Sequence, residues 1–183
     1  MLTAHARKYV AYTWLGFAGS GLIFFALHPQ LLQPDQLQAF FAGFDTQTRT
    51  VYVLVSLLKG FLLVPTIPFA VVGALLFPED AWFVFGVSIS GMLVSATFLY
   101  FFADNIGLGA YLEQKYPKKL ATCTHYLNKP YAVLLVIAWA FFPAVPTDLV
   151  CYIARLVGMN FWLMLAGILI GEGGLIIACI WLV

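Results

Sequence analysis

Charged residues are scarce in this sequence. They make up 9% of its 183 residues, whereas hydrophobic residues make up 63%. A soluble domain of this length needs far more charge on its surface, so the composition excludes one and indicates an integral membrane protein. The few basic residues form no stripe with interleaved aromatic residues, which excludes nucleic-acid binding.

Cysteine and histidine are also few. The three cysteines lie far apart and predict neither a disulfide framework nor a zinc site, and the three histidines are isolated. The sequence has no glycine-rich nucleotide loop and no nucleophile elbow. We therefore expect no cofactor and no enzymatic activity. The enzyme alternative is an intramembrane hydrolase that uses Asp148 and Glu172 as a pair of acids.

Proline, in contrast, occurs in two pairs of identical spacing. Pro65-Thr66-Ile67-Pro68 and Pro143-Ala144-Val145-Pro146 each interrupt an apolar segment, and a run of membrane-helix length follows each segment. Proline removes a backbone donor and ends helices, which hydrocarbon tolerates only where protein or a water-filled cavity satisfies the freed groups. The pattern therefore indicates a duplicated scaffold of the kind found in membrane transporters.

The N-terminal part of the chain comprises residues 1–48. The apolar stretch after Arg7 and Lys8 is too long for a cleaved secretory signal and lacks a cleavage site, so it predicts a retained signal-anchor helix at about residues 9–28. Residues 36–44 place Leu and Phe at helical spacing among polar residues. This shorter segment predicts a helix that lies in the membrane interface without crossing.

In residues 49–183, a predicted hairpin followed by a membrane-spanning helix occurs twice. The arms on either side of each proline pair are too short to cross a membrane alone, whereas each following run is long enough. The segments that we expect are a hairpin at 49–78, a span at 81–103, a basic cytoplasmic loop at 104–129, a second hairpin at 130–157 and a last span at 159–181.

Charge placement supports re-entrant hairpins, which return to the side of the membrane that they left. This topology puts every basic residue except Arg49 and Lys59 on one side, in agreement with the positive-inside rule. Full crossings also allow the basic loop and the N-terminus to share a side, so both topologies stay open. The predicted fold class is an all-α integral membrane protein with an inverted repeat of re-entrant hairpin plus transmembrane helix, preceded by one N-terminal transmembrane helix.

Two stretches resemble the DedA superfamily, which includes the VTT-domain and SNARE-associated membrane proteins. They are residues 62–77, Leu-Leu-Val-Pro-Thr-Ile-Pro-Phe-Ala-Val-Val-Gly-Ala-Leu-Leu-Phe, and residues 142–152, Phe-Pro-Ala-Val-Pro-Thr-Asp-Leu-Val-Cys-Tyr, followed by Leu156-Val157-Gly158-Met159 and Ile170-Gly171. The resemblance covers about residues 50–180. It implies opposed re-entrant hairpins and a role in moving polyprenyl-phosphate carriers or phospholipids across the bilayer.

The sequence departs from the pattern that the resemblance implies. Family members usually carry an arginine three positions before the first proline of the second hairpin, where this chain has Ala140. Many also carry an acid in the first hairpin, where this chain has Thr66, Phe69 and Ala70. In the family, both this arginine and this acid are associated with the proton-coupled transport of lipids with anionic headgroups. Arg155 is a candidate for a displaced cation.

Asp148 and Arg155 lie seven residues apart, on one helical face and about 10 Å apart along the axis, with Cys151 and Tyr152. One interpretation is a polar stripe in which Asp148 accepts a proton and Arg155 binds a headgroup. The other is that Asp148 stabilises a helix N-terminus that Thr147 caps, and that Arg155 is an interfacial anchor.

Glu172 lies in the middle of the last span, where an ionised carboxylate is costly. Its flanking glycines allow another backbone to approach, and a hairpin tip is the expected partner. We therefore hypothesise that Glu172 faces Asp148 and Thr147 and shares a proton with one of them. A merely structural hydrogen bond is the alternative.

The hairpin tips, marked by Pro65, Pro68, Pro143 and Pro146, direct helix N-termini and the Thr66 and Thr147 hydroxyls toward one volume that suits a phosphate. Alternatively, both threonines cap their helices. We expect Lys59 to extend outward to the interface, with a position in the cavity as the alternative.

Together with the resemblance to the DedA superfamily, which implies lipid movement, these features predict a lipid transporter of the flippase or scramblase type. A non-transporting membrane scaffold and an ion-coupled transporter of a small anion are the alternatives. We expect membrane lipids as partners and a bacterial inner (plasma) membrane location with the N-terminus in the cytoplasm, and the sequence leaves coupling to proton or sodium open. The sequence leaves a homo-oligomer open.

Overall fold

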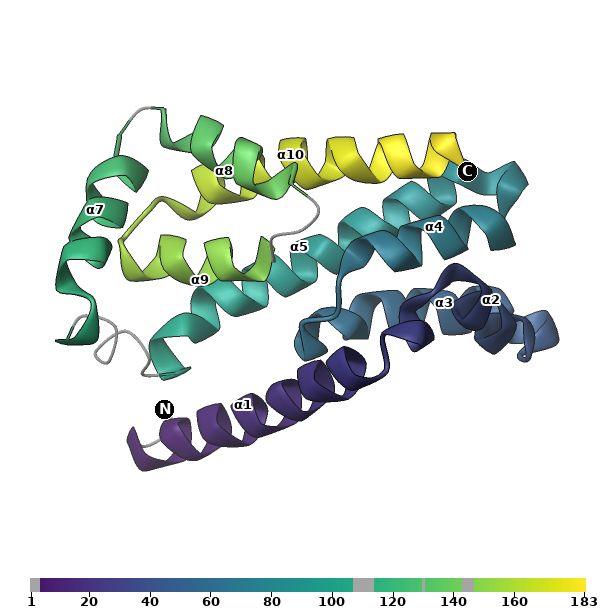
Figure 1. Ribbon diagram of the computed structural model, residues 1–183, viewed down its shortest axis with the longest axis horizontal. Coiled ribbons are helices and arrows are strands. Elements are labelled where there is room, and N and C mark those ends of the chain that lie inside the picture. The colour runs from purple at the N-terminus through teal and green to yellow at the C-terminus, as the bar shows by residue number, and fades with distance from the viewer. Residues whose placement is uncertain (1–3, 107–113, 130, 143–146) are drawn as a thin grey trace. The chain divides into compact units, whose positions relative to one another are not determined.

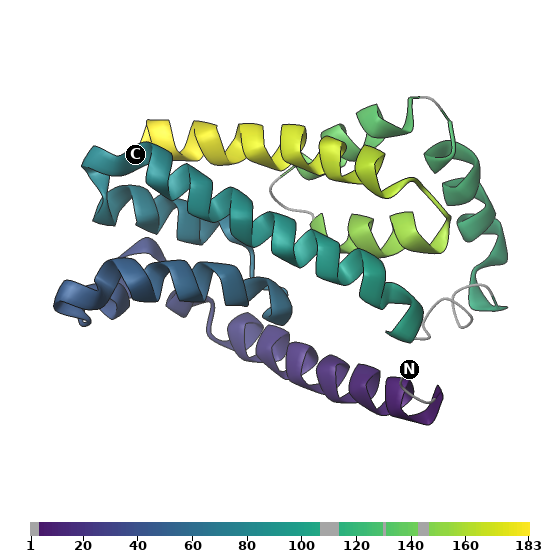
Figure 2. The same ribbon diagram turned by 180° about the vertical axis from the view of Figure 1, so that it is seen from behind.

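The computed structural model describes residues 4–106, 114–129, 131–142 and 147–183 of the chain (Figures 1 and 2). These described residues form helices and turns without a strand, so the predicted all-α class is confirmed. The α-helices are α1 (Ala4–Leu27), α2 (Pro34–Ala42), α3 (Thr48–Leu58), α4 (Thr66–Leu76), α5 (Ala81–Ile106), α7 (Pro117–Leu127), α8 (Ala132–Ala140), α9 (Thr147–Leu156) and α10 (Phe161–Leu182). Short 3-10 helices are η1 (Pro29–Leu32), η2 (Asp45–Gln47), η3 (Lys59–Leu62) and η4 (Pro78–Asp80).

The chain divides into two compact units, each built around one hairpin. The first-hairpin unit comprises Ala18–Ser95 and Gly173–Val183, and its hairpin consists of α3, η3 and α4. The second-hairpin unit comprises Met1–Phe17 and Ala96–Glu172, and its hairpin consists of α8 and α9. Helices α1, α5 and α10 each contribute residues to both units.

Proline sets where several short helices begin, because its missing N–H is no loss in a first helical turn. It occupies the first positions of η1, α2, η4 and α7. Pro65 directly precedes α4, and Pro68 lies inside the first turn of that helix. The first apolar segment is therefore interrupted at residues 63–65, before the second proline of the pair.

Two helices among the described residues are long and apolar enough to cross a membrane. These candidate spans are Pro78–Phe102 and Phe161–Leu182. Helix α1 has 24 residues, but its apolar part, Tyr12–Leu27, is shorter. A crossing by α1 therefore stays a prediction, as do the re-entrant hairpins and the inverted repeat.

Aromatic packing forms the core of the first-hairpin unit. Tyr52 of α3 is fully buried and donates a hydrogen bond from its hydroxyl to the Phe69 carbonyl of α4, at 3.1 Å. The Phe41 ring of α2 packs edge-on against Tyr52, with 5.5 Å between ring centroids, and against Phe69 at 6.4 Å. Helix α2 is thereby packed onto the hairpin that it precedes.

The burial of α2 refines the prediction of an interfacial helix at residues 36–44. Leu37 and Phe41 are buried in the core, whereas Phe40 and Phe44 are exposed. All four residues are among the Leu and Phe residues at helical spacing in residues 36–44. This spacing identifies an apolar face but does not show whether protein or lipid covers it. Only the exposed pair is available to a membrane surface, and that contact stays a prediction.

Capping and one glycine turn connect α9 to α10 in the second-hairpin unit, where α8 and α9 lie side by side (Figures 1 and 2). Gly158 adopts a φ of +73°, a left-handed conformation that favours glycine, and the Met159 N–H donates to the Ala154 carbonyl at 2.9 Å. The Asn160 side chain then accepts hydrogen bonds from the N–H groups of Trp162 and Leu163, at 2.9 and 3.3 Å, which caps α10.

In each unit the first arm of the hairpin lies directly against the long helix that follows. A Cβ added to Gly91 of α5 would collide with the Ser56 carbonyl of α3. A Cβ added to Gly171 of α10 would lie 2.6 Å from the Ile137 carbonyl of α8. Close approach at small residues is how apolar helices pack without a hydrophobic driving force, so these glycines hold both hairpins in place.

Candidate functional site

Two charged side chains are buried among the described residues, and they have opposite signs. Lys59 is 5% exposed and belongs to the first-hairpin unit, and Glu172 is 7% exposed and belongs to the second-hairpin unit. Burying a charge is costly unless hydrogen bonds or an opposite charge compensate it. Each unit therefore has one position where the chain accepts that cost, and both positions need a chemical explanation.

Lys59 connects the two arms of the first hairpin. It follows α3 as the first residue of η3, and its ammonium nitrogen donates a hydrogen bond to the Thr66 hydroxyl, at 3.1 Å. Thr66 is the first residue of α4. The ammonium nitrogen also lies 5.5 Å from the centroid of the Phe69 ring, within the range of a cation–π interaction. The lysine head therefore lies at the N-terminal end of α4.

A strained turn between α3 and α4 brings Lys59 close to Thr66. Leu63 adopts a φ of +57°, which a leucine rarely does because its Cβ crowds the backbone. The Val64 N–H donates to the Lys59 carbonyl at 3.3 Å, and the Leu63 N–H donates to the Gly60 carbonyl at 3.2 Å. These bonds close the chain tightly on itself, so that the end of α3 faces the start of α4.

The expectation that Lys59 extends outward to the interface is wrong. Its side chain is buried and reaches across the turn to Thr66. The left-handed conformation of Leu63 reverses the chain direction and brings Thr66 close to Lys59. A cap by Thr66 is not observed either, since α4 begins without a side-chain cap and the Thr66 hydroxyl accepts from Lys59 instead. The proposed use of Thr66 for substrate stays a prediction.

In the second-hairpin unit two acids lie around one buried thiol. Asp148 is half-buried in the first turn of α9, Glu172 is buried in α10, and both lie within electrostatic range of Cys151. The Cys151 thiol donates to the Thr147 carbonyl at 3.5 Å. Three predicted site residues therefore interact with Cys151: Thr147 through a hydrogen bond, and Asp148 and Glu172 electrostatically. A shared proton between the acids stays a prediction.

The backbone of α8 approaches the glycine that precedes Glu172. A Cβ added to Gly171 would lie 2.6 Å from the Ile137 carbonyl and 3.2 Å from the Phe141 nitrogen. The flanking glycines predicted such an approach from a hairpin tip, whereas the described contact comes from the end of the first arm. Gly171 therefore positions Glu172 next to the second hairpin.

Ala140 occupies the position where the family resemblance implies an arginine. It is 2% exposed, and its Cβ would lie 2.8 Å from a Cβ on Gly171. A long cationic side chain does not fit between these backbones without displacing α8 from α10. The cation missing from this position is consistent with the packing of this chain, and the buried cation of the described hairpins is Lys59 instead.

Arg155 and Tyr152 lie toward the other end of α9. Arg155 is half-buried in the last turn, and its guanidinium carbon lies 5.5 Å from the centroid of the Tyr100 ring. The Tyr100 hydroxyl donates to the Met159 carbonyl at 2.6 Å, which fixes that ring. Tyr152 is buried and packs with Trp14, Phe102 and Leu156. Headgroup binding by Arg155 and participation of Tyr152 stay predictions.

The predicted tip residues are described in one hairpin only. Pro65 and Pro68 lie at the start of α4, whereas Pro143 and Pro146 lie outside the described residues. Lys59 is the site residue that sequence reasoning placed incorrectly. No sequence signal indicated its contact with Thr66, because that contact depends on the left-handed conformation of Leu63 in the turn between α3 and α4.

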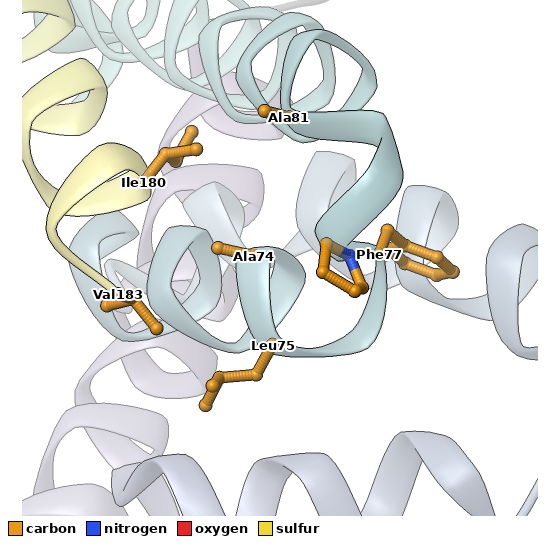
Figure 3. A pocket seen from close by; sticks show the side chains of 7 residues that line it. Ala74, Leu75, Phe77, Ala81, Ile180 and Val183 are labelled. Carbon is orange, nitrogen blue, oxygen red and sulfur yellow. The ribbon is translucent and has the colours of Figure 1, made fainter.

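A pocket in the first-hairpin unit is lined by apolar side chains and offers no charged side chain to a headgroup (Figure 3). Its lining side chains are apolar, and they come from the end of α4, from η4, from the start of α5 and from the C-terminal end of the chain. They are Ala74, Leu75, Phe77, Pro78, Ala81, Ile180 and Val183. The polar positions described above, not this pocket, are therefore the candidate site.

The described residues are all-helical, include two candidate spans and bury one charge in each hairpin unit, which are features of an α-helical membrane protein. Comparison with protein families gives a match to the VTT domain over residues 64–182, most of the chain. The chain belongs to this membrane-associated family, the DedA and SNARE-associated family, which confirms the resemblance read from its hairpin residues. No curated protein and no solved structure matches the chain significantly.

Proposed function

We propose that this protein is a membrane lipid transporter of the flippase or scramblase type. It moves the headgroup of a phospholipid or a polyprenyl phosphate through a wet cavity between two opposed re-entrant hairpins. Membership of the VTT family makes lipid transport plausible for this chain. The observation that carries the proposal is the pair of buried opposite charges, Lys59 and Glu172, one in each hairpin unit.

The physical reason is that a charged headgroup does not cross hydrocarbon unaided. A buried cation and buried acids along a path replace part of the water that the headgroup loses. In this proposal Asp148 accepts a proton, Glu172 exchanges it, and the Thr66 and Thr147 hydroxyls bind headgroup oxygens. The protein acts as a carrier and not as an enzyme, in a plasma membrane with its N-terminus in the cytoplasm.

Lipid movement in reconstituted vesicles tests the proposal. Fluorescent phospholipid is placed in both leaflets, and a membrane-impermeant quencher reports how fast the inner pool reaches the outer leaflet. We expect the wild type to move lipid and Glu172→Gln, which keeps the shape and removes the charge, to slow movement at least about tenfold, as for other charged hydrogen-bonding groups. The matched control is Asp80→Asn, an exposed acid outside the hairpin.

The outcomes of that assay separate transport from its alternatives. No movement by the wild type with either phospholipid or polyprenyl phosphate contradicts the proposal. Equal rates for wild type and Glu172→Gln, with an unchanged pH dependence, contradict a proton role for Glu172. Uptake of a soluble anion without lipid movement indicates an anion transporter instead.

The scaffold alternative is favoured by one observation. Ala140 is packed tightly against Gly171, where the family resemblance implies a cation. A chain that lost transport would retain the fold and lose charge at such a position. The buried Lys59 shows that the first hairpin unit has kept a charged group, which a scaffold that has lost transport need not keep.

A further inference from the structure

We propose that helix α7, Pro117–Leu127, together with the lysines in and beside it, forms a surface that binds the anionic headgroups of the neighbouring membrane leaflet. The partner is a lipid surface and not a single lipid molecule held in a pocket. This surface lies outside both hairpins, so the inference does not rest on transport. The charge of the segment, the two faces of α7 and its place at the ends of the candidate spans carry the inference.

Positive charge is concentrated in and beside α7. Residues 114–147 contain no aspartate or glutamate, whereas four lysines fall between residues 115 and 129. Lys118 and Lys119 lie in the first turn of the helix, Lys129 follows its end, and all three are exposed. A cluster of lysines close to a membrane-spanning helix is attracted by anionic lipids. The charge of this segment is therefore complementary to an anionic leaflet.

Helix α7 has an apolar face and a basic face. Leu120, Cys123 and Leu127 recur at helical spacing and are half-buried, and α7 packs against α8. Lys118 and Lys119 are exposed on the other side of the helix. Because the protein partly covers the apolar face, the basic face is the one that is open to a partner.

The position of α7 brings this basic face to a membrane surface. The Asn128 side chain, just after α7, donates to the Val157 carbonyl at 2.9 Å, in the turn between α9 and α10. The Phe161 ring, which starts one candidate span, lies 5.1 Å from the Phe101 ring near the end of the other. Both candidate spans therefore end beside this turn. Helix α7 runs crosswise to α9 and to the end of α5, so it lies along the membrane surface (Figures 1 and 2).

Exposed aromatic side chains are typical of the headgroup level. Trp162 lies at the start of α10, and Tyr116, Tyr126 and Tyr131 lie in and beside α7; all four are exposed. The Lys119 ammonium nitrogen lies 5.5 Å from the centroid of the Tyr116 ring. Tryptophan and tyrosine favour the membrane interface, where lysine extends its charge toward phosphate groups. Together with the nearby span ends, these residues favour a lipid surface over a soluble polyanion.

Quenching of a label on α7 in lipid nanodiscs tests this surface in the full-length protein. In a chain whose three native cysteines are replaced by alanine, Thr122→Cys carries a fluorophore one turn beyond Lys118, whose carbonyl accepts from the Thr122 hydroxyl at 2.9 Å. The nanodiscs contain phosphatidylcholine alone or phosphatidylcholine with phosphatidylglycerol, and acrylamide is the uncharged aqueous quencher. We expect phosphatidylglycerol to protect the label, and added salt to reduce that protection.

Replacement of two lysines measures the contribution of charge. Lys118→Gln with Lys119→Gln should lower the ratio of protected to quenched label at least about tenfold in phosphatidylglycerol nanodiscs, because each lysine near an anionic surface contributes about fivefold. Lys118→Arg with Lys119→Arg should retain the protection. Both side chains are exposed, so neither double variant should change the melting temperature.

A second labelled position is the matched control. Thr46→Cys replaces an exposed threonine next to Asp45 in the first-hairpin unit, and its label should be quenched equally in both kinds of nanodisc. Equal quenching of the Thr122→Cys label in both kinds overturns the proposal, and so does protection that survives the loss of both lysines. Stronger protection by added RNA than by phosphatidylglycerol assigns the surface to a soluble polyanion and also overturns the proposal.

Discussion

The two hairpin units share a way of packing and differ in their chemistry. In both, the first arm of the hairpin lies against a glycine of the next long helix, Gly91 in one unit and Gly171 in the other. The first-hairpin unit buries a cation, Lys59, and the second-hairpin unit buries an acid, Glu172. Backbone contacts thus repeat along the chain, whereas the polar groups that they position do not.

Under the proposed function, this difference separates the contacts that hold the fold from the groups that bind or move the substrate. Small residues are required wherever two backbones approach closely, irrespective of the reaction or substrate. Buried charges lower stability and are retained where they bind or move something. We therefore expect changes at the shared contacts to act on stability, and changes at Lys59 and Glu172 to act on binding and transport.

The largest expected effect concerns the shared glycine contacts. Gly91→Ala and Gly171→Ala put a methyl group against the carbonyls of Ser56 and Ile137, so each should destabilise the protein by about 1–3 kcal/mol through overpacking. Thermal unfolding in detergent, followed by circular dichroism, measures the loss. Similar losses in both variants sharpen the comparison.

Gly86 is the matched control for these variants. It lies on α5, and a Cβ there meets nothing within 4 Å. Gly86→Ala should be neutral or stabilising by up to about 1 kcal/mol, because alanine favours the helix over glycine. If Gly91→Ala and Gly171→Ala unfold at the temperature of Gly86→Ala, the two hairpins are not held by these contacts.

A smaller effect is expected at one buried tyrosine in each unit. The Tyr52 hydroxyl donates to the Phe69 carbonyl at 3.1 Å, and the Tyr100 hydroxyl donates to the Met159 carbonyl at 2.6 Å. Tyr52→Phe and Tyr100→Phe should each cost about 1 kcal/mol of unfolding free energy, since a carbonyl loses its partner while the ring stays. Chemical denaturation measures both, and a neutral result in one unit alone would break the parallel between the units.

The smallest effect is expected at the base of the first hairpin. Arg49 pairs with Asp80 at 3.0 Å, and its guanidinium carbon lies 4.0 Å from the centroid of the Phe83 ring. Both charged side chains are about half exposed, so solvent screening limits the loss in Arg49→Met to less than about 1 kcal/mol. The difference in melting temperature from wild type should shrink as salt is added, and a large loss that salt does not change would contradict an exposed pair.

The sequence predicted much of the helix layout, because proline and apolar length act locally. Pro65 and Pro68 correctly indicated a helix that ends and begins again, since a missing N–H has the same consequence in any fold. The apolar run before Asp104 likewise indicated a helix of membrane length. None of these inferences needed knowledge of which segments are neighbours.

The burial of Lys59 could be predicted only with knowledge of which segments are neighbours. Its contact with Thr66 depends on the left-handed conformation of Leu63, which a leucine does not favour and the sequence does not announce. The role of Phe41 was equally inaccessible, because periodicity marks an apolar face without naming what covers it. The sequence therefore predicted the segments but not the contacts between them.

Labelling of single cysteines in the two hairpins tests the central claim most directly. In a chain whose Cys123, Cys151 and Cys179 are replaced by alanine, Ile67→Cys and Val145→Cys are exposed in turn to an impermeant maleimide, in vesicles of either orientation. Two re-entrant hairpins predict that each site reacts from one side only and that the two sides are opposite. Labelling of both sites from the same side, or of neither from any side, would contradict the account.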